Sequence, residues 1–273
     1  MHGDSGARKD GGYQLSHAMW LEKAGDVEGA AAAYRTVIEA GVPHTAGMAA
    51  TNLGVLLTRH GDPEGAAAAY RQAVDSGHPD AAPLAAANLG VLLQQQGDVD
   101  GAAAAYRSAV DSGHPDAAPR AAFDLGNMLA ERGDAEGARA ALQHAVDSGH
   151  PEDAPGAAFC LGYLLKQQGR PEEARAAYQL AIDSGHPRAG SMAACNLGFL
   201  LKLQGDADGA AAAYRRAIDF GHPDFAPKAA LDLGLLLAGN GDPDGARSAL
   251  QRVVDSGHPH LSEDARTALA GLG

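Results

Sequence analysis

The sequence predicts an all-α protein: a right-handed α-solenoid of about seven helical hairpins followed by a C-terminal capping helix. The main observation is a block of 36 residues that recurs along the chain of 273, opening with Gly-Asp and closing with Asp-Ser-Gly-His-Pro. Two consecutive blocks, residues 61–96 and 97–132, are identical at 25 of 36 positions. Self-similarity at this period is typical of stacked units rather than of a closed globule. The frame begins at Gly25, Gly61, Gly97, Gly133, Gly169, Gly205 and Gly241.

Each block carries the signals of two helices joined by a tight turn. Asp80 is suited to cap a first helix, because apolar residues at helical spacing follow it. Gly97 then supplies a left-handed position that ends this helix, and Asp98 can cap a second one. The dipeptide His114-Pro115 favours an extended connection, since the residue before proline avoids the helical region. We call the first helix of each block helix A and the second helix B.

The frame assigns elements along the whole chain. Helix A is expected near residues 12–24, 45–60, 81–96, 117–132, 153–168, 189–204 and 225–240, each followed by a helix B. Residues 261–271 are expected to form a final helix with a charged outer side, as the end of a solenoid requires. Residues 1–10 are expected to be a disordered tail and residues 11–273 a single solenoid domain. Trp20, at the position of Leu56 and Leu92, is expected to belong to the core or the cap.

The order of small and aromatic residues in the block resembles that of the tetratricopeptide repeat family. The matching residues in one block are Leu89-Gly90, Gly97, Ala102, Tyr106 and Ala109. The resemblance covers about residues 11–273. The block is a 36-residue variant, two residues longer than the usual length of about 34, and it has Ala86 where the family has an aromatic residue. Its Asp-Ser-Gly-His ending resembles the related Sel1-type repeats. The resemblance implies an interaction scaffold whose concave groove is lined by the A helices.

Positions that vary between blocks on the A helices are candidates for a binding site. The position two residues before the glycine of Leu-Gly holds Ser16, Asn52, Asn88, Asp124, Cys160, Asn196 and Asp232. Asparagine offers donors and an acceptor, and the resemblance implies that Asn52, Asn88 and Asn196 bind the backbone of an extended peptide. Asp124 and Asp232 would favour a basic or amine-bearing ligand. The alternative is that these side chains make only local contacts or bind water.

Aromatic residues enter the same face only in the middle blocks. They are Phe123, Phe159, Tyr163 and Phe199, which include three of the five phenylalanines. Phe159 and Tyr163 are four residues apart and share a helix face, and helices about 8–10 Å apart would bring the other rings beside them. Burial of each ring is worth roughly 1.5–3 kcal/mol, so a pocket of roughly micromolar affinity is expected. Alternatively, the rings pack against one another inside a tightly curved surface.

The charge of the chain narrows the class of partner. The formal net charge of −13 argues against a nucleic-acid binder, because binding to phosphate depends on Lys and Arg. Basic or neutral proteins or peptides are the expected partners. No stretch reaches the roughly 20 apolar residues of a membrane helix and the N-terminus has no apolar signal region, so a cytoplasmic location is expected. The composition, poor in Lys and rich in Ala, Gly, Arg and Asp, fits a bacterial genome of high GC content but could equally reflect the repeat alone.

Two residue types suggest other chemistry. A histidine recurs before proline in successive blocks, but equivalent atoms of neighbouring blocks should lie about 8–10 Å apart, too far to share one zinc ion. We therefore expect these histidines to bond the backbone of their turns, and we expect no metal or other cofactor. Cys160 and Cys195 are expected to be free thiols, because adjacent helix axes exceed the Cα separation of a disulfide. No catalytic motif interrupts the repeat, so enzyme activity is not expected.

The sequence therefore predicts a non-catalytic scaffold that binds a protein or peptide in the groove lined by its A helices. The predicted site comprises Asn52, Asn88, Asp124, Asn196, Asp232, Phe123, Phe159, Tyr163 and Phe199. Two alternatives stay open at this point. One is a structural protein that assembles into dimers or filaments, and the other is a binder of a small ligand at the central aromatic patch.

Overall fold

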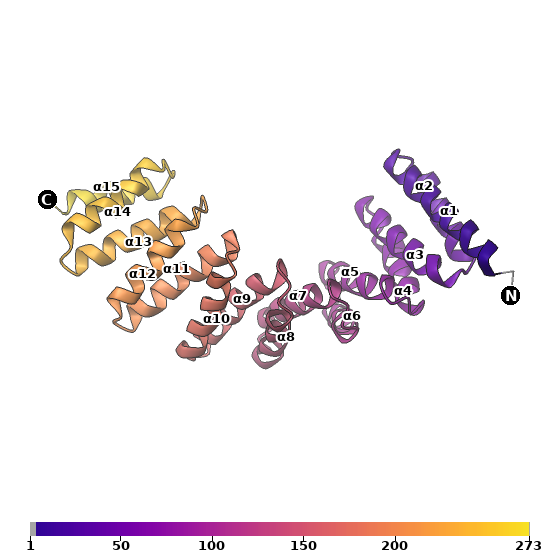
Figure 1. The fold of residues 1–273 in the computed structure, drawn as a ribbon, viewed down its shortest axis with the longest axis horizontal. Helices are drawn as coiled ribbons and strands as arrows, with labels where there is room; N and C mark the ends of the chain where they lie inside the picture. Colours follow the sequence, from indigo (N-terminus) through magenta and orange to yellow (C-terminus); the bar gives the residue numbers. More distant parts are fainter. Residues whose placement is uncertain (1–3, 273) are drawn as a thin grey trace. The chain divides into compact units, whose positions relative to one another are not determined.

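The structure is a computed structural model in which residues 4–272 are described, with side chains from residue 11 onward. Every regular element in this part of the chain is an α-helix (Figure 1). The helices are α1 (Asp4–Lys23), α2 (Val27–Glu39), α3 (Pro43–Arg59), α4 (Pro63–Asp75), α5 (Ala81–Gln95), α6 (Val99–Asp111), α7 (Ala117–Glu131), α8 (Ala135–Asp147), α9 (Asp153–Gln167), α10 (Pro171–Asp183), α11 (Pro187–Leu203), α12 (Ala207–Asp219), α13 (Phe225–Gly239), α14 (Pro243–Asp255) and α15 (Leu261–Ala270). The all-α solenoid prediction is confirmed: helices A and B alternate in seven successive pairs, and α15 follows them.

The chain divides into two compact units, Met1–Met128 and Leu129–Gly273, and the division falls inside α7. A single solenoid domain over residues 11–273 stays a prediction. Of the predicted tail, residues 1–3 lie outside the described residues. Residues 4–10 are the first residues of α1, which therefore starts before the predicted position near residue 12.

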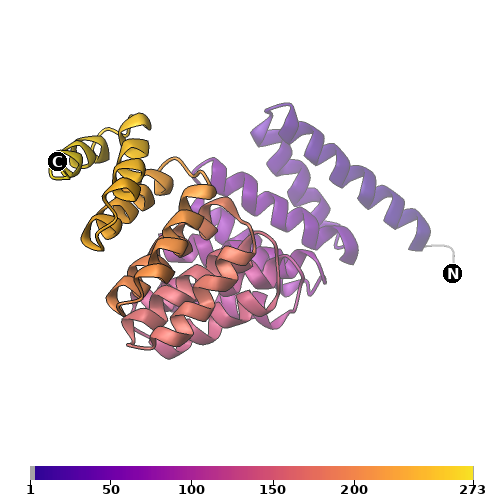
Figure 2. The same ribbon diagram turned by 60° about the vertical axis from the view of Figure 1, so that its left-hand side comes forward.

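The helices of each unit pack in a regular order. Helices that follow one another are in contact, as α3 with α4, α4 with α5 and α5 with α6. The A helices also contact one another: α1 with α3 and α3 with α5 in the first unit, and α9 with α11, α11 with α13 and α13 with α15 in the second. Within a unit, the described B helices make no such contact with one another. The A helices therefore form the more closely packed side of each unit, and α9 and α11 lie side by side in both ribbon views (Figures 1 and 2).

A Gly-Asp dipeptide forms the turn inside six of the seven described hairpins. Gly97 has a φ of 80°, which glycine adopts without steric strain, and it follows the end of α5. The Asp98 carboxylate then accepts a hydrogen bond of 3.0 Å from the Gly101 N–H and caps α6, as predicted. The same cap recurs at Asp26, Asp62, Asp134, Asp206 and Asp242. At one turn Arg170 replaces aspartate and forms an ion pair with Glu173 at 2.6 Å.

The connection from helix B to the next helix A is capped by histidine rather than by aspartate. The expectation that Asp80 caps α5 is wrong, because its side chain makes no capping hydrogen bond. Instead, Nδ1 of His78 accepts hydrogen bonds from the N–H groups of Asp80 and Ala81, both at 3.1 Å. Nδ1 accepts a backbone N–H in the same way at His114, His186, His222 and His258. The recurring histidines thus supply acceptors for N–H groups that have no partner within the helix.

Helices A and B of a hairpin approach each other closely at the glycine of Leu-Gly. A Cβ atom on Gly90 would lie 2.5 Å from ring carbons of Tyr106, far inside van der Waals contact. The same contact pairs Gly54 with Tyr70, Gly162 with Tyr178, and Gly198 with Tyr214, and Leu250 replaces tyrosine opposite Gly234. The first hairpin carries Ala18 and Tyr34 at these positions, and both are fully buried. The ring fills the space that the missing glycine side chain leaves free.

Trp20 is exposed, contrary to the expectation that it belongs to the core or the cap. Its exposed fraction is 62%, and its ring stacks on His17 with centroids 6.1 Å apart. The equivalent residues of later hairpins, Leu56 and Leu92, are 2% and 5% exposed. The helices that carry those leucines pack on a preceding hairpin, whereas no hairpin precedes α1 in the described structure.

Gly90→Ala should destabilise the protein. The added methyl group must push α5 and α6 apart or displace Tyr106, and overpacking of this kind costs about 1–3 kcal/mol. Gly239→Ala is the matched control, because a Cβ atom there would meet nothing within 4 Å, and alanine favours a helix over glycine by about 0.5–1 kcal/mol. Urea denaturation followed by circular dichroism should give a lower midpoint for the first variant and an equal or higher one for the second. A Gly90 variant as stable as the wild type would contradict the importance of this contact.

Candidate functional site

The predicted site residues all lie on A helices, but they fall in both units. Those of the first unit are Asn52, Asn88, Phe123 and Asp124, on α3, α5 and α7. Those of the second unit are Phe159, Tyr163, Asn196, Phe199 and Asp232, on α9, α11 and α13. Tyr163 and Phe199 are exposed and the others are half-buried. The predicted residues therefore form a separate set on each unit.

Two of the three asparagines interact within the protein. The Asn196 side chain donates a hydrogen bond of 2.9 Å to the Met192 carbonyl in its own helix. The Asn52 amide lies within hydrogen-bonding reach of the Tyr34 hydroxyl. The Asn88 side chain has no hydrogen bond to another described residue. Because each amide has two donor hydrogens and an acceptor, these local bonds leave further sites for a peptide backbone. The asparagine ladder stays a prediction.

Both aspartates at the ladder position face a cation of their own helix. Asp124 accepts a hydrogen bond from Nε of Arg120, and Asp232 accepts one from Nζ of Lys228, each at 3.3 Å. Each partner lies four residues away along the helix, where side chains meet. These carboxylates therefore give the A-helix surfaces less negative charge than the sequence suggests, which weakens the argument for a basic ligand.

The four predicted aromatic residues differ in burial. Phe159 is half-buried and packs on Tyr178 with ring centroids 6.2 Å apart, so part of its surface belongs to the hairpin core. Tyr163 and Phe199 are 45% and 47% exposed, and their helices α9 and α11 are in contact. Phe123 is half-buried in the first unit. Of the four, Tyr163 and Phe199 thus offer the largest free apolar surface.

A third apolar residue, which the sequence reasoning missed, continues this series. Leu235 is 47% exposed and lies one residue after the glycine of Leu-Gly on α13, the position that Tyr163 and Phe199 hold on α9 and α11. We call Tyr163, Phe199 and Leu235 the apolar row. The sequence signal for Leu235 is the repeat position that it shares with Tyr163 and Phe199. Leu235 was missed because only aromatic residues were considered at that position.

A lysine, also missed, lies against the rings of the apolar row. The Lys166 ammonium is 5.0 Å from the centroid of the Tyr163 ring and 5.6 Å from that of Phe199, within the range of cation–π interactions. Lys202 stands at the equivalent position on α11, three residues after Phe199. In the first unit this position is held by Glu22, Thr58 and Gln94, none of which is cationic. The second unit therefore combines apolar and cationic groups on one surface.

In three hairpins the tyrosine hydroxyl of helix B bonds the residue of helix A at the position that the lysines hold in the second unit. Tyr106 donates a hydrogen bond of 2.9 Å to Gln94, and Tyr34 donates one of 2.7 Å to Glu22. The Tyr178 hydroxyl is buried, and no group in the described part of the chain accepts a hydrogen bond from it. Burial raises the pKa of this hydroxyl, so it stays protonated at neutral pH.

Cys160 and Cys195 are free thiols, as expected. Burial raises the pKa of each thiol to about 11, so both are protonated at neutral pH, the form that is not nucleophilic. Sγ of Cys195 lies 3.8 Å from the Phe225 carbonyl oxygen, to which it donates a weak hydrogen bond. The two cysteines therefore act as small packing residues.

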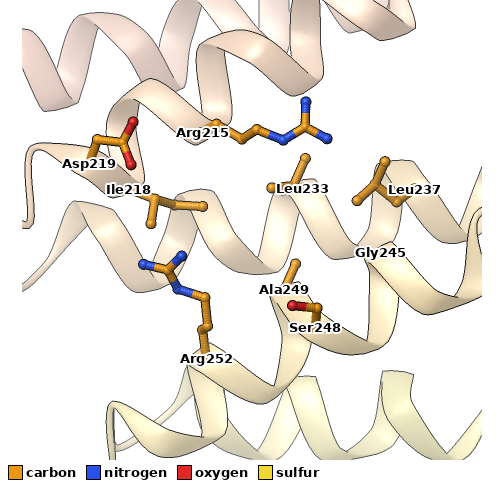
Figure 3. Close-up of a pocket in the computed structure, with 9 residues that line it drawn as sticks. All are labelled: Arg215, Ile218, Asp219, Leu233, Leu237, Gly245, Ser248, Ala249 and Arg252. Atoms are coloured by element: carbon orange, nitrogen blue, oxygen red, sulfur yellow. The ribbon is translucent and has the colours of Figure 1, made fainter.

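A second kind of surface feature lies between B helices. A groove of about 330 Å³ between α12 and α14 is lined by Leu233 and Leu237 of α13, with Arg215 and Arg252 on the flanking helices (Figure 3). An equivalent groove of about 300 Å³ lies between α2 and α4 in the first unit, lined from the same repeat positions. Because both grooves use the same positions, we attribute them to the spacing of the B helices rather than to a specialised site.

Two other kinds of feature are absent from the described residues. In the described residues there is no group of three or more His, Cys, Asp or Glu side chains that could hold a metal ion. None of the described helices is long and apolar enough to cross a membrane.

Phe159 and Phe199 should respond differently to truncation. Phe159→Ala removes packing from Tyr178 and should cost about 2 kcal/mol of unfolding free energy. Phe199→Ala removes a ring that is 47% exposed and should change the unfolding free energy by less than about 1 kcal/mol. Thermal melting of both variants measures the difference. An equal loss of stability in the two variants would show that Phe199 is a core residue.

Comparisons with known proteins identify the repeat. The tetratricopeptide repeat profile matches residues 15–86, 87–158, 123–193, 159–230, 195–260 and 231–273. No curated protein sequence matches the chain.

Several solved structures are similar in fold. The C-terminal part of a tetratricopeptide repeat protein from Cytophaga hutchinsonii aligns with a TM-score of 0.68 at 14% identity, covering 93% of this chain and 99% of that one. PilF of Pseudomonas aeruginosa aligns with a TM-score of 0.55 at 22% identity, covering 76% of this chain and 90% of that one. A tetratricopeptide repeat protein from Parabacteroides merdae aligns with a TM-score of 0.52 at 16% identity, covering 97% and 99%. At these identities the likeness shows the fold alone. Since the repeat profile also covers residues 15–273, the chain belongs to the tetratricopeptide repeat family.

Proposed function

We propose that the protein is a non-catalytic scaffold that binds a protein or peptide on the A-helix surface of its second unit. The family supports an interaction scaffold in general. The observation that carries the finer proposal is the apolar row, in which large apolar side chains at equivalent positions of α9, α11 and α13 are 45–47% exposed. Contiguous exposed apolar surface on a folded protein is typical of interaction sites.

The apolar row can supply much of the affinity for a peptide. Full burial of a large apolar side chain is worth roughly 1.5–3 kcal/mol, and each member of the row has about half of that still to gain. Ordering a flexible peptide opposes this gain. Polar contacts beside the row are therefore needed for an affinity in the micromolar range.

Asparagines at the ladder position supply such contacts. Asn196 lies three residues before Phe199 on α11, so its amide is on the same helix face as the row. In the first unit, Asn52 and Asn88 hold the same position on α3 and α5. We propose that the Asn196 amide pairs with the N–H and C=O groups of a peptide bound along the row, without regard to its side chains, and that Asn52 and Asn88 offer the same contacts on the first unit by itself, where the apolar row is absent. The apolar row then selects the sequence.

Removal of the two rings of the row should abolish peptide binding without unfolding the protein. Peptides selected from a random display library on the wild-type protein should bind Tyr163→Ala/Phe199→Ala at least about tenfold more weakly, as truncation of an interface anchor does. Because both rings are exposed, the melting temperature should change little. Fluorescence anisotropy with labelled peptides measures the affinity.

The matched control is Val55→Ala/Val91→Ala, which truncates apolar residues at the same repeat position on α3 and α5. This control should leave the affinity unchanged. Equal binding by the wild type and the Tyr163/Phe199 variant would rule out the apolar row as the site. Loss of binding in the control alone would move the site to the first unit.

A second candidate function is self-association, and the exposure of Trp20 favours it. Tyr13, His17 and Trp20 are spaced for one face of α1, and Tyr13 is also exposed. Two copies of such a face are self-complementary in a two-fold dimer. Light scattering over a wide concentration range should then show a mass that rises with concentration for the wild type but not for Trp20→Ser. A constant monomer mass for both proteins would remove this candidate.

A further inference from the structure

The A helices of the second unit present a cationic surface on an acidic chain. Three of the five lysines of the protein lie on α9, α11 and α13, and these are Lys166, Lys202 and Lys228. The acidic residues of these three helices are Asp153 and Asp232, and each lies beside a nitrogen: Nδ1 of His150 at 2.9 Å and Nζ of Lys228 at 3.3 Å. The acidic residues that give the chain its net charge of −13 therefore lie on its other surfaces.

Lys166 and Lys202 have no carboxylate partner within the described structure. Lys166 instead rests on the rings of Tyr163 and Phe199. A cation–π contact uses one side of an ammonium group, and its three N–H donors still need acceptors. Water fills that role in the free protein, and an anion bound beside the apolar row would replace it. The row and its lysines thus favour a ligand that is both apolar and negatively charged.

Lys166 also replaces the hydrogen-bond acceptor that the tyrosine hydroxyl has in other hairpins. Tyr34 and Tyr106 donate to Glu22 and Gln94 of helix A, and Tyr70 bonds Thr58, but Lys166 holds that position here. Lysine offers only donors, so it cannot accept from the hydroxyl. Buried polar groups in proteins are nearly always hydrogen-bonded, so an acceptor for Tyr178 is missing. Lys202 and Tyr214 repeat this combination in the next hairpin.

Resting on the proposed function, we infer that this surface binds acidic peptide segments in which carboxylates flank an apolar side chain. A carboxylate accepts hydrogen bonds from the Lys166 ammonium, while the apolar side chain covers the row. Neighbouring helices lie about 8–10 Å apart, which an extended peptide spans in about three residues of roughly 3.4 Å each. Carboxylates two or three residues apart therefore reach Lys166 and Lys202. This ligand class differs from the basic or neutral partner that the overall charge suggests.

Three labelled probe peptides test the inference by fluorescence anisotropy. The acidic probe is Gly-Glu-Phe-Glu-Leu-Glu-Gly, and the neutral and basic probes replace each Glu by Gln or by Lys. The acidic probe should bind at least about tenfold more tightly than the neutral one at low salt, and added salt should reduce the difference. The basic probe should bind most weakly.

Variants of the protein locate the interaction. Lys166→Gln and Lys202→Gln should each weaken binding of the acidic probe by about three- to fivefold, as expected for exposed charge pairs. Arg252→Gln, which makes the same change of charge in the B-helix groove, is the matched control and should have no effect. Tyr178→Phe is a second control: it removes a buried hydroxyl that a peptide cannot reach, so binding should be unchanged and the melting temperature unchanged or higher.

The outcomes separate this inference from the proposed function. If the neutral or basic probe binds as tightly as the acidic one and loses affinity in Tyr163→Ala/Phe199→Ala, the preference for acidic segments is wrong and the proposed function stands. If every probe binds the wild type and that double variant equally, both are wrong. Equal weakening by Lys166→Gln and Arg252→Gln would mean a general charge effect and would also overturn the inference.

Discussion

The contact between the Leu-Gly glycine of helix A and the tyrosine of helix B decides how each hairpin presents its residues. At Gly90 the ring of Tyr106 occupies the space of a side chain, so this side of α5 must face α6. The position four residues later lies nearly below glycine on the helix and meets the tyrosine hydroxyl, as Gln94 does. The position one residue after glycine is rotated by about 100° and lies on the A-helix surface. A single close contact therefore defines both positions of the candidate site.

The two units use this common framework with different chemistry. The position after glycine holds exposed Met19 and half-buried Val55 and Val91 in the first unit, but exposed Tyr163, Phe199 and Leu235 in the second. The position that meets the tyrosine hydroxyl holds Glu22, Thr58 and Gln94 in the first unit, and lysine on α9 and α11 in the second. These substitutions leave turns, caps and the glycine contact in place, because they fall outside all three. A repeat protein of this kind can thus acquire a binding surface without altering the residues that hold its hairpins together.

The helices, turns and caps could be predicted from the sequence, whereas the exposure of individual side chains and the partners of charged groups could not. The period of 36, the left-handed Gly97 and the Asp98 cap follow from local rules, which act within a few residues. Trp20 could not be placed by its repeat position, because burial depends on whether another hairpin covers it. Net charge says little about the charge of one surface, since a sum over the chain hides the lysines on α9, α11 and α13. The ion pairs of Asp124 and Asp232 can be recognised in the sequence only after the helices are assigned, because each cationic partner lies four residues away on the same helix.

Hydrogen–deuterium exchange with and without the acidic probe is the most direct measurement of where this protein binds. We predict slower exchange in α9, α11 and α13 in the presence of the probe, with no change in α12, α14 or the first unit. Protection that appears instead on the B helices, or on α3 and α5, would contradict a binding surface built on the apolar row and its lysines.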